Sequence, residues 1–192
     1  KVIASELPTT VIRTLFNHNN KWFRDRARKA IGSFNAIGED RLKIFNEKRE
    51  IVVNGAVDLE KGKLAAEKSC LVCHKLYGNG YDVGPDLTGV GRSSLDALLS
   101  NVIIPNQIIG NGYELVIVET KDFRTVSGRL IEDTPNQVTL VNAGGAKSTI
   151  ERDNIESLTK TKQSVMPEGL ELMPDEEFRN LIWYILSPHE EG

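Results

Sequence analysis

The chain holds two cysteines, and a histidine directly follows the second one, in the run Cys70-Leu71-Val72-Cys73-His74. With spacings of i, i+3 and i+4, the three functional side chains would lie on one face of a helix. On such a face two thiols can bond to the two vinyl groups of one porphyrin while the imidazole reaches its iron. The C-x-x-C-H pattern is the attachment signature of a c-type haem. We therefore expect haem c, bound through Cys70 and Cys73, with His74 as an iron ligand.

Two other kinds of site also use paired cysteines. A zinc site would need further Cys or His ligands at ligand spacing, and the remaining histidines, His18 and His189, are far from the motif in sequence. A redox dithiol of the thioredoxin kind would need a βαβ context. Neither alternative needs a histidine directly after the second cysteine, so haem attachment is the favoured interpretation.

Composition limits the class of protein. The chain has 192 residues, of which 40% are hydrophobic and 27% are charged, which fits one domain with an insertion or two small domains. No apolar run approaches the roughly 18 residues of a membrane span, so we expect no membrane span in this fragment. The net charge is −3. The acidic majority, 27 Asp and Glu against 24 Lys and Arg, argues against nucleic acid as a partner. The charge is uneven: basic residues prevail in residues 1–57 and acidic residues in 58–192.

The cellular location follows from the motif. Covalent haem attachment takes place outside the cytoplasm, so we expect a periplasmic or otherwise exported protein. The chain begins at Lys1 and shows no signal peptide. We therefore expect it to be the C-terminal part of a larger secreted protein.

Helices should surround the motif. Asp58 is a good N-cap for a helix that leads to Cys70. Gly62 lies inside this helix, where glycine costs about 1 kcal/mol against alanine. A close contact with the last helix, predicted over Asp175–Ser187, would explain that cost. A further apolar helix is predicted over 93–104, before Pro105.

The order of these features resembles a known family. The C-x-x-C-H run, Gly84-Pro85-Asp86-Leu87-Thr88-Gly89-Val90-Gly91-Arg92, the Met166-Pro167 pair and the last helix follow one another as in a class I c-type cytochrome. Residues 58–192 resemble more closely the planctomycete-type haem-binding domain, which occurs at the C-terminus of large secreted proteins, often beside a dehydrogenase domain.

The resemblance implies roles for three further residues. The Pro85 carbonyl would accept a hydrogen bond from the second ring nitrogen of His74, and Arg92 would lie near a haem propionate. Met166 would be the second axial ligand of the iron. The other methionine, Met173, also precedes a proline, and we expect it to pack against Phe178 as a hydrophobic staple. With both axial positions filled, the iron has no open site for oxygen or peroxide chemistry.

A β-rich segment separates the two expected axial ligands. Five short strands are predicted over 113–120, 123–131, 137–142, 147–151 and 155–160. Five strands in about fifty residues indicate a small SH3- or Sm-like barrel. This insertion would either bind a partner or shield the haem, or else be a structural insertion without a ligand, and we favour the structural interpretation.

The first 57 residues are expected to be helical. Apolar periodicity predicts helices over 9–17 and 21–31, and a third over Glu39 to about Val52. The first two together weakly resemble one HEAT-type repeat. A basic run is a candidate docking face for the acidic haem domain or an acidic redox partner: Arg24, Arg26, Arg28 and Lys29.

These inferences combine into one expectation. The fold would be a mainly α cytochrome c fold with an inserted small all-β module and an N-terminal HEAT-like segment. The domains would be 1–57 (helical), 58–110 with 161–192 (haem domain) and 111–160 (β-rich insertion). The protein would be an electron carrier rather than an enzyme, accepting electrons from a partner or fused dehydrogenase. The alternative is a haem enzyme or gas sensor with a labile sixth ligand.

Overall fold

The structure is a computed structural model that describes residues 11, 15, 18–31, 33–34 and 38–188. The helix predicted over 9–17 lies almost entirely outside these residues. The α-helices with defined bounds are α2 (Lys21–Ile31), α3 (Glu39–Val53), α4 (Leu59–Ser69), α5 (Leu95–Ile103) and α6 (Asp175–Leu186). The strands are β1 (Ser33–Phe34), β2 (Lys75–Leu76), β3 (Asn79–Gly80), β4 (Ile108–Ile109), β5 (Glu114–Thr120), β6 (Thr125–Asp133), β7 (Gln137–Val141), β8 (Lys147–Glu151) and β9 (Ile155–Ser164).

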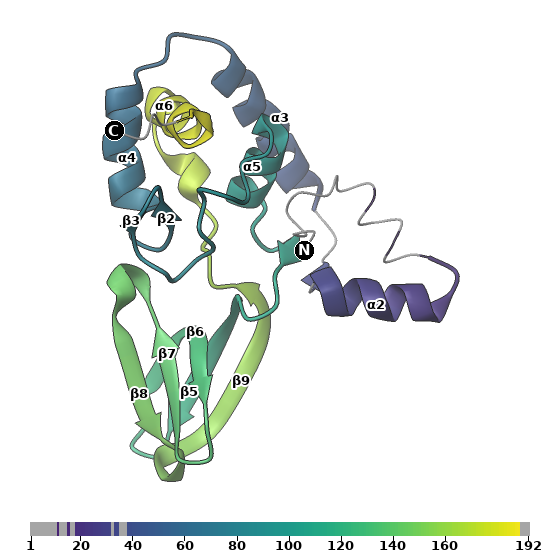
Figure 1. Cartoon of the computed structure of the whole chain (residues 1–192), viewed down its shortest axis with the longest axis vertical. Helices are drawn as coiled ribbons and strands as arrows, with labels where there is room; N and C mark the ends of the chain where they lie inside the picture. The colour runs from purple at the N-terminus through teal and green to yellow at the C-terminus, as the bar shows by residue number, and fades with distance from the viewer. Residues whose placement is uncertain (1–10, 12–14, 16–17, 32, 35–37, 189–192) are drawn as a thin grey trace.

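The molecule has a helical end and a sheet end. Helices α3 to α6 gather at one end, the strands β5 to β9 form the other, and α2 extends to the side (Figure 1). None of the helices within the described ranges is long and apolar enough to cross a lipid bilayer.

Helices α4 and α6 cross closely at a glycine. The Asp58 carboxylate caps α4 by accepting the Lys61 N–H at 3.1 Å, and the Asn180 side-chain oxygen accepts the Asp58 N–H at 2.9 Å. A β-carbon on Gly62 would lie only 2.8 Å from the Asn180 carbonyl carbon and from the Tyr184 β-carbon. The predicted contact at Gly62 is confirmed: glycine is present because the helix backbones approach too closely for a larger residue.

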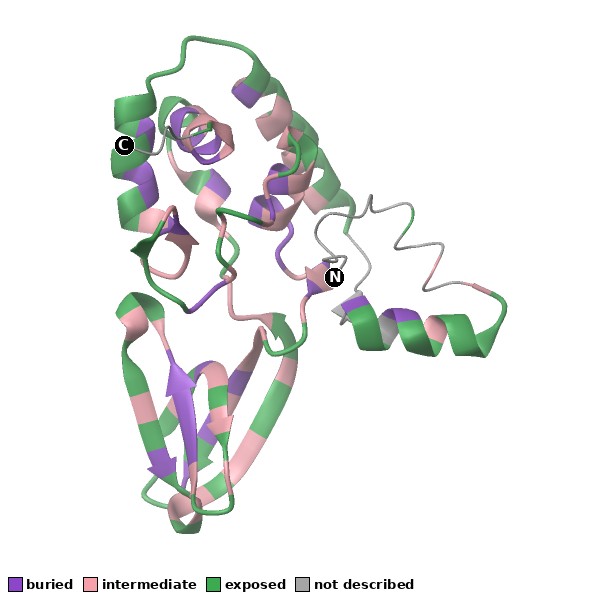
Figure 2. Ribbon diagram, in the orientation of Figure 1, coloured by how far each residue is buried: buried purple, intermediate pink, exposed green. Residues whose placement is uncertain are grey.

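One apolar core holds the helical end together. Its largest fully buried side chains come from α3, α5 and α6: Val52, Leu99, Ile103, Phe178, Leu181, Ile182 and Ile185. The indole Nε1–H of Trp183 donates to the Val52 carbonyl at 2.9 Å, which joins α6 to α3. Figure 2 shows the buried faces of these helices turned toward one another.

The sheet end is a five-stranded antiparallel sheet with the order β8-β7-β6-β5-β9. All five predicted strands are present, because they are rich in β-branched residues, which favour the extended backbone of a sheet. The sheet has a separate apolar core, made by Val116, Val118, Val138, Leu140 and Ile150. No ladder joins β8 to β9 among the described residues, so these strands form the edges of an open sheet rather than closing the predicted barrel.

The predicted fold class is wrong. The protein is a mixed α/β structure with 41% helix and 25% strand, not a mainly α cytochrome c fold. The sequence-based prediction treated the strands as a small addition to a helical domain. The sheet has its own buried core, so it is a second packing unit and not a minor addition to the helices. The helical pattern around the C-x-x-C-H motif did not indicate this.

Candidate cofactor site

The cysteine motif lies in a turn that continues from α4. The α-helix ends at Ser69, so the predicted helical face does not extend through the motif. The Cys70 carbonyl accepts the N–H groups of both Cys73 and His74, at 3.0 and 2.8 Å. The bond to His74 spans four residues, as in an α-helix, and the turn therefore keeps the functional residues close together. Both cysteines are free thiols.

His74 is held in one orientation. Its Nδ1–H donates to the Pro85 carbonyl at 2.7 Å, as the resemblance implied. Since a carbonyl can only accept, Nδ1 carries the proton and Nε2 keeps its lone pair. Gly84 lies against the ring: a β-carbon there would come within 2.5 Å of Nδ1 and 2.7 Å of Nε2. The backbone at Gly84 and Pro85 therefore both makes room for the imidazole and fixes its tautomer.

Burial sets the protonation states of the motif. It lowers the pKa of His74, although the hydrogen bond to Pro85 opposes this effect. The imidazole is therefore neutral at neutral pH, the form that ligates a metal ion. Burial also raises the pKa of the thiols of Cys70 and Cys73. A redox dithiol of the thioredoxin kind needs a thiol whose pKa is lowered, so these thiols do not fit that alternative.

The zinc alternative finds no ready-made ligand group among the described residues. In the part of the chain that the structure describes, no three His, Cys, Asp or Glu side chains come together as metal ligands would. Cys70, Cys73 and His74 are among the described residues, and they do not form such a group either. A tetrahedral zinc site would require such a group.

The motif opens onto a large apolar cavity of about 1410 Å³. This volume exceeds the roughly 300–1,000 Å³ of an ordinary small-molecule site. Both thiols and the His74 ring contribute to its wall. Much of the rest is made by aliphatic side chains of α5 and α6: Leu98, Val102, Leu181, Ile182 and Ile185. Such a cavity suits a large, flat, mainly apolar group.

The two methionines differ in their relation to the cavity. Met166 contributes to its lining together with His74, whereas Met173 does not. The Met166 N–H donates to the Ser164 hydroxyl at 3.1 Å, which ties this residue to the end of β9. Met173, like Met166, packs against the helical core that contains Phe178; its predicted staple contact with Phe178 stays a prediction. The structure thus brings Met166, not Met173, to the same cavity as the cysteine motif.

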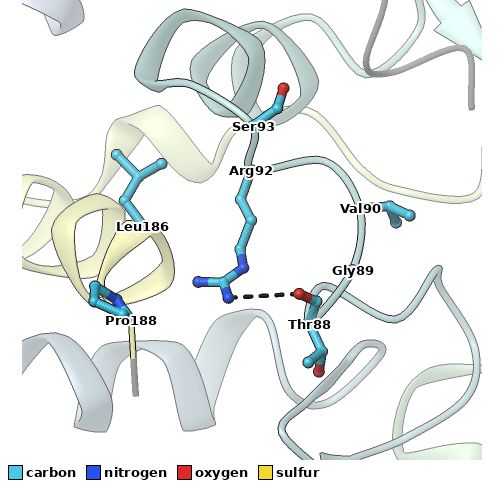
Figure 3. A pocket seen from close by; sticks show the side chains of 7 residues that line it. All are labelled: Thr88, Gly89, Val90, Arg92, Ser93, Leu186 and Pro188. Atoms are coloured by element: carbon cyan, nitrogen blue, oxygen red, sulfur yellow. Dashed lines mark hydrogen bonds between the residues drawn. The ribbon is translucent and has the colours of Figure 1, made fainter. Parts of the chain in front are cut away.

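Arg92 lies apart from this cavity. Its guanidinium donates to the carbonyls of Ile185 and Ser187 at 2.8 and 3.1 Å and also to the Tyr77 hydroxyl. A longer bond of 3.4 Å reaches the Thr88 carbonyl (Figure 3). The bonds to Ile185 and Ser187 are made at the carboxyl end of α6, where a cation is favourable for the helix dipole. Arg92 therefore anchors the last helix; it is not itself among the residues that line the cavity, although its partner Ile185 is.

The sheet reaches the site, which the sequence did not indicate. The turn between β7 and β8 places Asn142 and Ala143 in the cavity wall. In the same turn, the Gly144 N–H donates to the Val72 carbonyl, inside the C-x-x-C-H motif, at 2.6 Å. From β6, Arg129 Nη1 donates to the Val83 carbonyl at 2.9 Å. The structural interpretation of the insertion is thus incomplete, because its turn forms part of the candidate site.

The N-terminal segment also contributes to the cavity. Lys29, Ala30 and Ile31, at the end of α2, form part of its lining, and the Asn111 side-chain amide donates to the Lys29 carbonyl at 3.1 Å. One member of the predicted basic run, Lys29, lies at the cavity, and Arg24 and Arg26 do not. The side chain of Arg28 is outside the described residues. A local charge pattern carries no information about such long-range contacts.

Comparisons with known proteins give no match: no family model matches this chain, and no curated protein does. The geometry of the site is therefore the basis for a functional assignment.

Proposed function

We propose that this protein is an electron carrier with a covalently bound haem c. The observation that carries the proposal is that Cys70, Cys73, His74 and Met166 contribute to one large apolar cavity. The residues fit the group in chemistry and size: two free thiols, a neutral imidazole with a free Nε2, a thioether and apolar walls. A bound haem supplies one-electron exchange at its iron.

The two thiols would make the covalent attachment. Each S–H adds across a vinyl C=C bond, so that sulfur bonds to one vinyl carbon, the hydrogen goes to the other, and a thioether results. No oxidant is needed for this addition. Because burial raises the pKa of both thiols, they persist as neutral S–H groups at neutral pH until they react.

His74 and Met166 would hold the iron from its two faces. The hydrogen bond to Pro85 (2.7 Å) orients the imidazole and makes Nε2 a stronger donor. A thioether as the other ligand raises the reduction potential, which suits an electron carrier. If both residues hold the iron, neither oxygen nor peroxide would find an open site there.

The cavity wall would keep water from the ring. Leu98 and Val102 of α5 and Ile182 and Ile185 of α6 are aliphatic and form one apolar surface. A low local dielectric disfavours the more highly charged oxidation state and so also raises the potential. These residues would therefore tune the potential without taking part in bonding.

The cellular setting is part of the same proposal. Attachment of haem c takes place outside the cytoplasm, so the protein would be periplasmic or otherwise exported. The resemblance of residues 58–192 to the planctomycete-type haem-binding domain supports an electron source in a fused or separate dehydrogenase.

The test is the spectrum of the full chain, produced in an exported form together with the haem-attachment machinery. The proposal predicts a low-spin, six-coordinate iron with a sulfur-to-iron charge-transfer band. Met166→Ala should remove that band, and Met173→Ala, the matched control, should keep it. A high-spin iron, or ready binding of carbon monoxide at neutral pH, would instead favour a haem enzyme or gas sensor.

A further inference from the structure

A buried ion pair fixes the segment that follows Met166 in the chain. Glu171 belongs to the short 3-10 helix Leu170–Leu172 and is only 4% exposed. One of its oxygens accepts from Arg41 Nη1 at 2.6 Å. The other accepts the Gly169 N–H at 3.1 Å. The carboxylate therefore binds both its own loop and a residue 130 positions earlier in the chain.

Arg41 connects this loop to a second wall of the cavity. It comes from α3, and its side chain is 22% exposed in the pair. The second guanidinium nitrogen, Nη2, donates to the carbonyl of Ile103, the last residue of α5. Since Leu170 on the loop and Val102 on α5 both line the cavity, Arg41 ties together the two segments that flank Met166.

We infer that Arg41 is a positioning residue for Met166, acting through Glu171; this inference rests on the proposed function. A planar guanidinium can donate in two fixed directions at once, which the ammonium of lysine cannot reproduce. Because the pair is largely buried, its attraction is screened little by solvent. The geometry points to a brace that holds the Met166 loop at a set distance from α5, and so keeps the thioether on the iron.

The chain provides a matched control for this brace. Arg49, also on α3, donates to Asp96 on α5 at 2.7 Å. Its pair joins the same two helices, but the side chains are 40% and 60% exposed and neither lines the cavity. Replacing Arg49 removes an arginine and an ion pair between α3 and α5 without touching the Met166 loop.

The experiment measures how readily added imidazole displaces Met166 from the iron in the haem-loaded full chain. Loss of the sulfur-to-iron band reports the displacement. In Arg41→Met, imidazole should bind at least tenfold more tightly than in the wild type, because the competing thioether is held less firmly. In Arg49→Met the affinity should stay within twofold of wild type. Hydrogen exchange at the Gly169 amide should accelerate in Arg41→Met alone.

Two further variants keep the inference open to refutation if Arg41→Met does not fold. Arg41→Lys keeps the charge and loses one of the two directed bonds, and Glu171→Gln keeps an acceptor for the Gly169 N–H. Both should give an intermediate affinity for imidazole. Folded Arg41 variants with wild-type imidazole affinity would overturn the inference and leave the proposed function standing. A wild-type protein without the sulfur band would overturn both.

Discussion

The close crossing of α4 and α6 at Gly62 predicts that alanine at this position destabilises the protein. A β-carbon on Gly62 would lie 2.8 Å from the carbonyl carbon of Asn180 and equally close to the Tyr184 β-carbon. Both atoms belong to α6 and neither is at the end of a flexible side chain. The helices α4 and α6 would therefore have to move apart to accept Gly62→Ala.

Two effects of opposite sign set the magnitude. Alanine is intrinsically better than glycine inside a helix by about 1 kcal/mol. Overpacking of a close contact costs roughly 1–3 kcal/mol, and contact with rigid atoms of α6 puts Gly62→Ala near the upper end of that range. We expect the free energy of unfolding to fall by about 1–2 kcal/mol. At about 2–4 °C per kcal/mol for a chain of this size, Tm should fall by roughly 2–8 °C.

The assay is urea and thermal unfolding of the haem-loaded full chain, with a control on the same helix. Lys63 is exposed and adjacent to the crossing, so the difference between Lys63→Ala and Lys63→Gly gives the intrinsic preference of this helix for alanine, about 1 kcal/mol. If Gly62→Ala raises stability by that same amount, α4 and α6 are not in close contact and the reasoning is refuted.

Three other predictions concern the loop after the motif. Gly84→Ala should push the His74 ring out of its hydrogen bond and turn part of the iron high-spin; an unchanged low-spin absorbance spectrum would contradict this. Arg92→Gln should lower the free energy of unfolding by about 2 kcal/mol, because charged hydrogen bonds to α6 are lost, with little change in reduction potential; a large change in potential at unchanged stability would place the guanidinium at a propionate instead. Hydrogen bonds from Thr88 hold the pKa of Asp86 below its ordinary value, so its contribution to stability is complete above about pH 4 and is lost as pH falls through the lowered pKa; denaturation of Asp86→Asn should show a deficit at pH 7 that shrinks and disappears as the pH falls below the lowered pKa.

Local patterns predicted the parts of the structure that depend on neighbouring residues. The five strands follow from their β-branched content, the N-cap of α4 follows from Asp58, and the start of α6 follows from its acidic first turn. The contact at Gly62 could be predicted because a glycine inside a helix needs a reason. The C-x-x-C-H motif is likewise contained in one short run, and its haem chemistry stays a prediction.

Apart from the crossing at Gly62, contacts between distant segments could not be predicted in this way. Nothing near Gly144 indicates that its N–H bonds to Val72, and nothing near Arg41 indicates a partner at Glu171. These contacts depend on how the sheet and α3 pack against the other helices, which a local pattern does not encode. The same limit explains the wrong fold class: the periodicity of the strands gave their number but not the size of the core they share.

Intact-mass measurement of the exported full chain, combined with a pyridine haemochrome assay, tests the central claim most directly. We predict one haem per chain that survives denaturation, and a loss of this covalent adduct in the Cys70→Ser, Cys73→Ser double variant. A chain that has the mass of the bare polypeptide after production with the haem-attachment machinery, and that gives no haemochrome signal, would contradict the assignment of Cys70 and Cys73 as haem attachment residues.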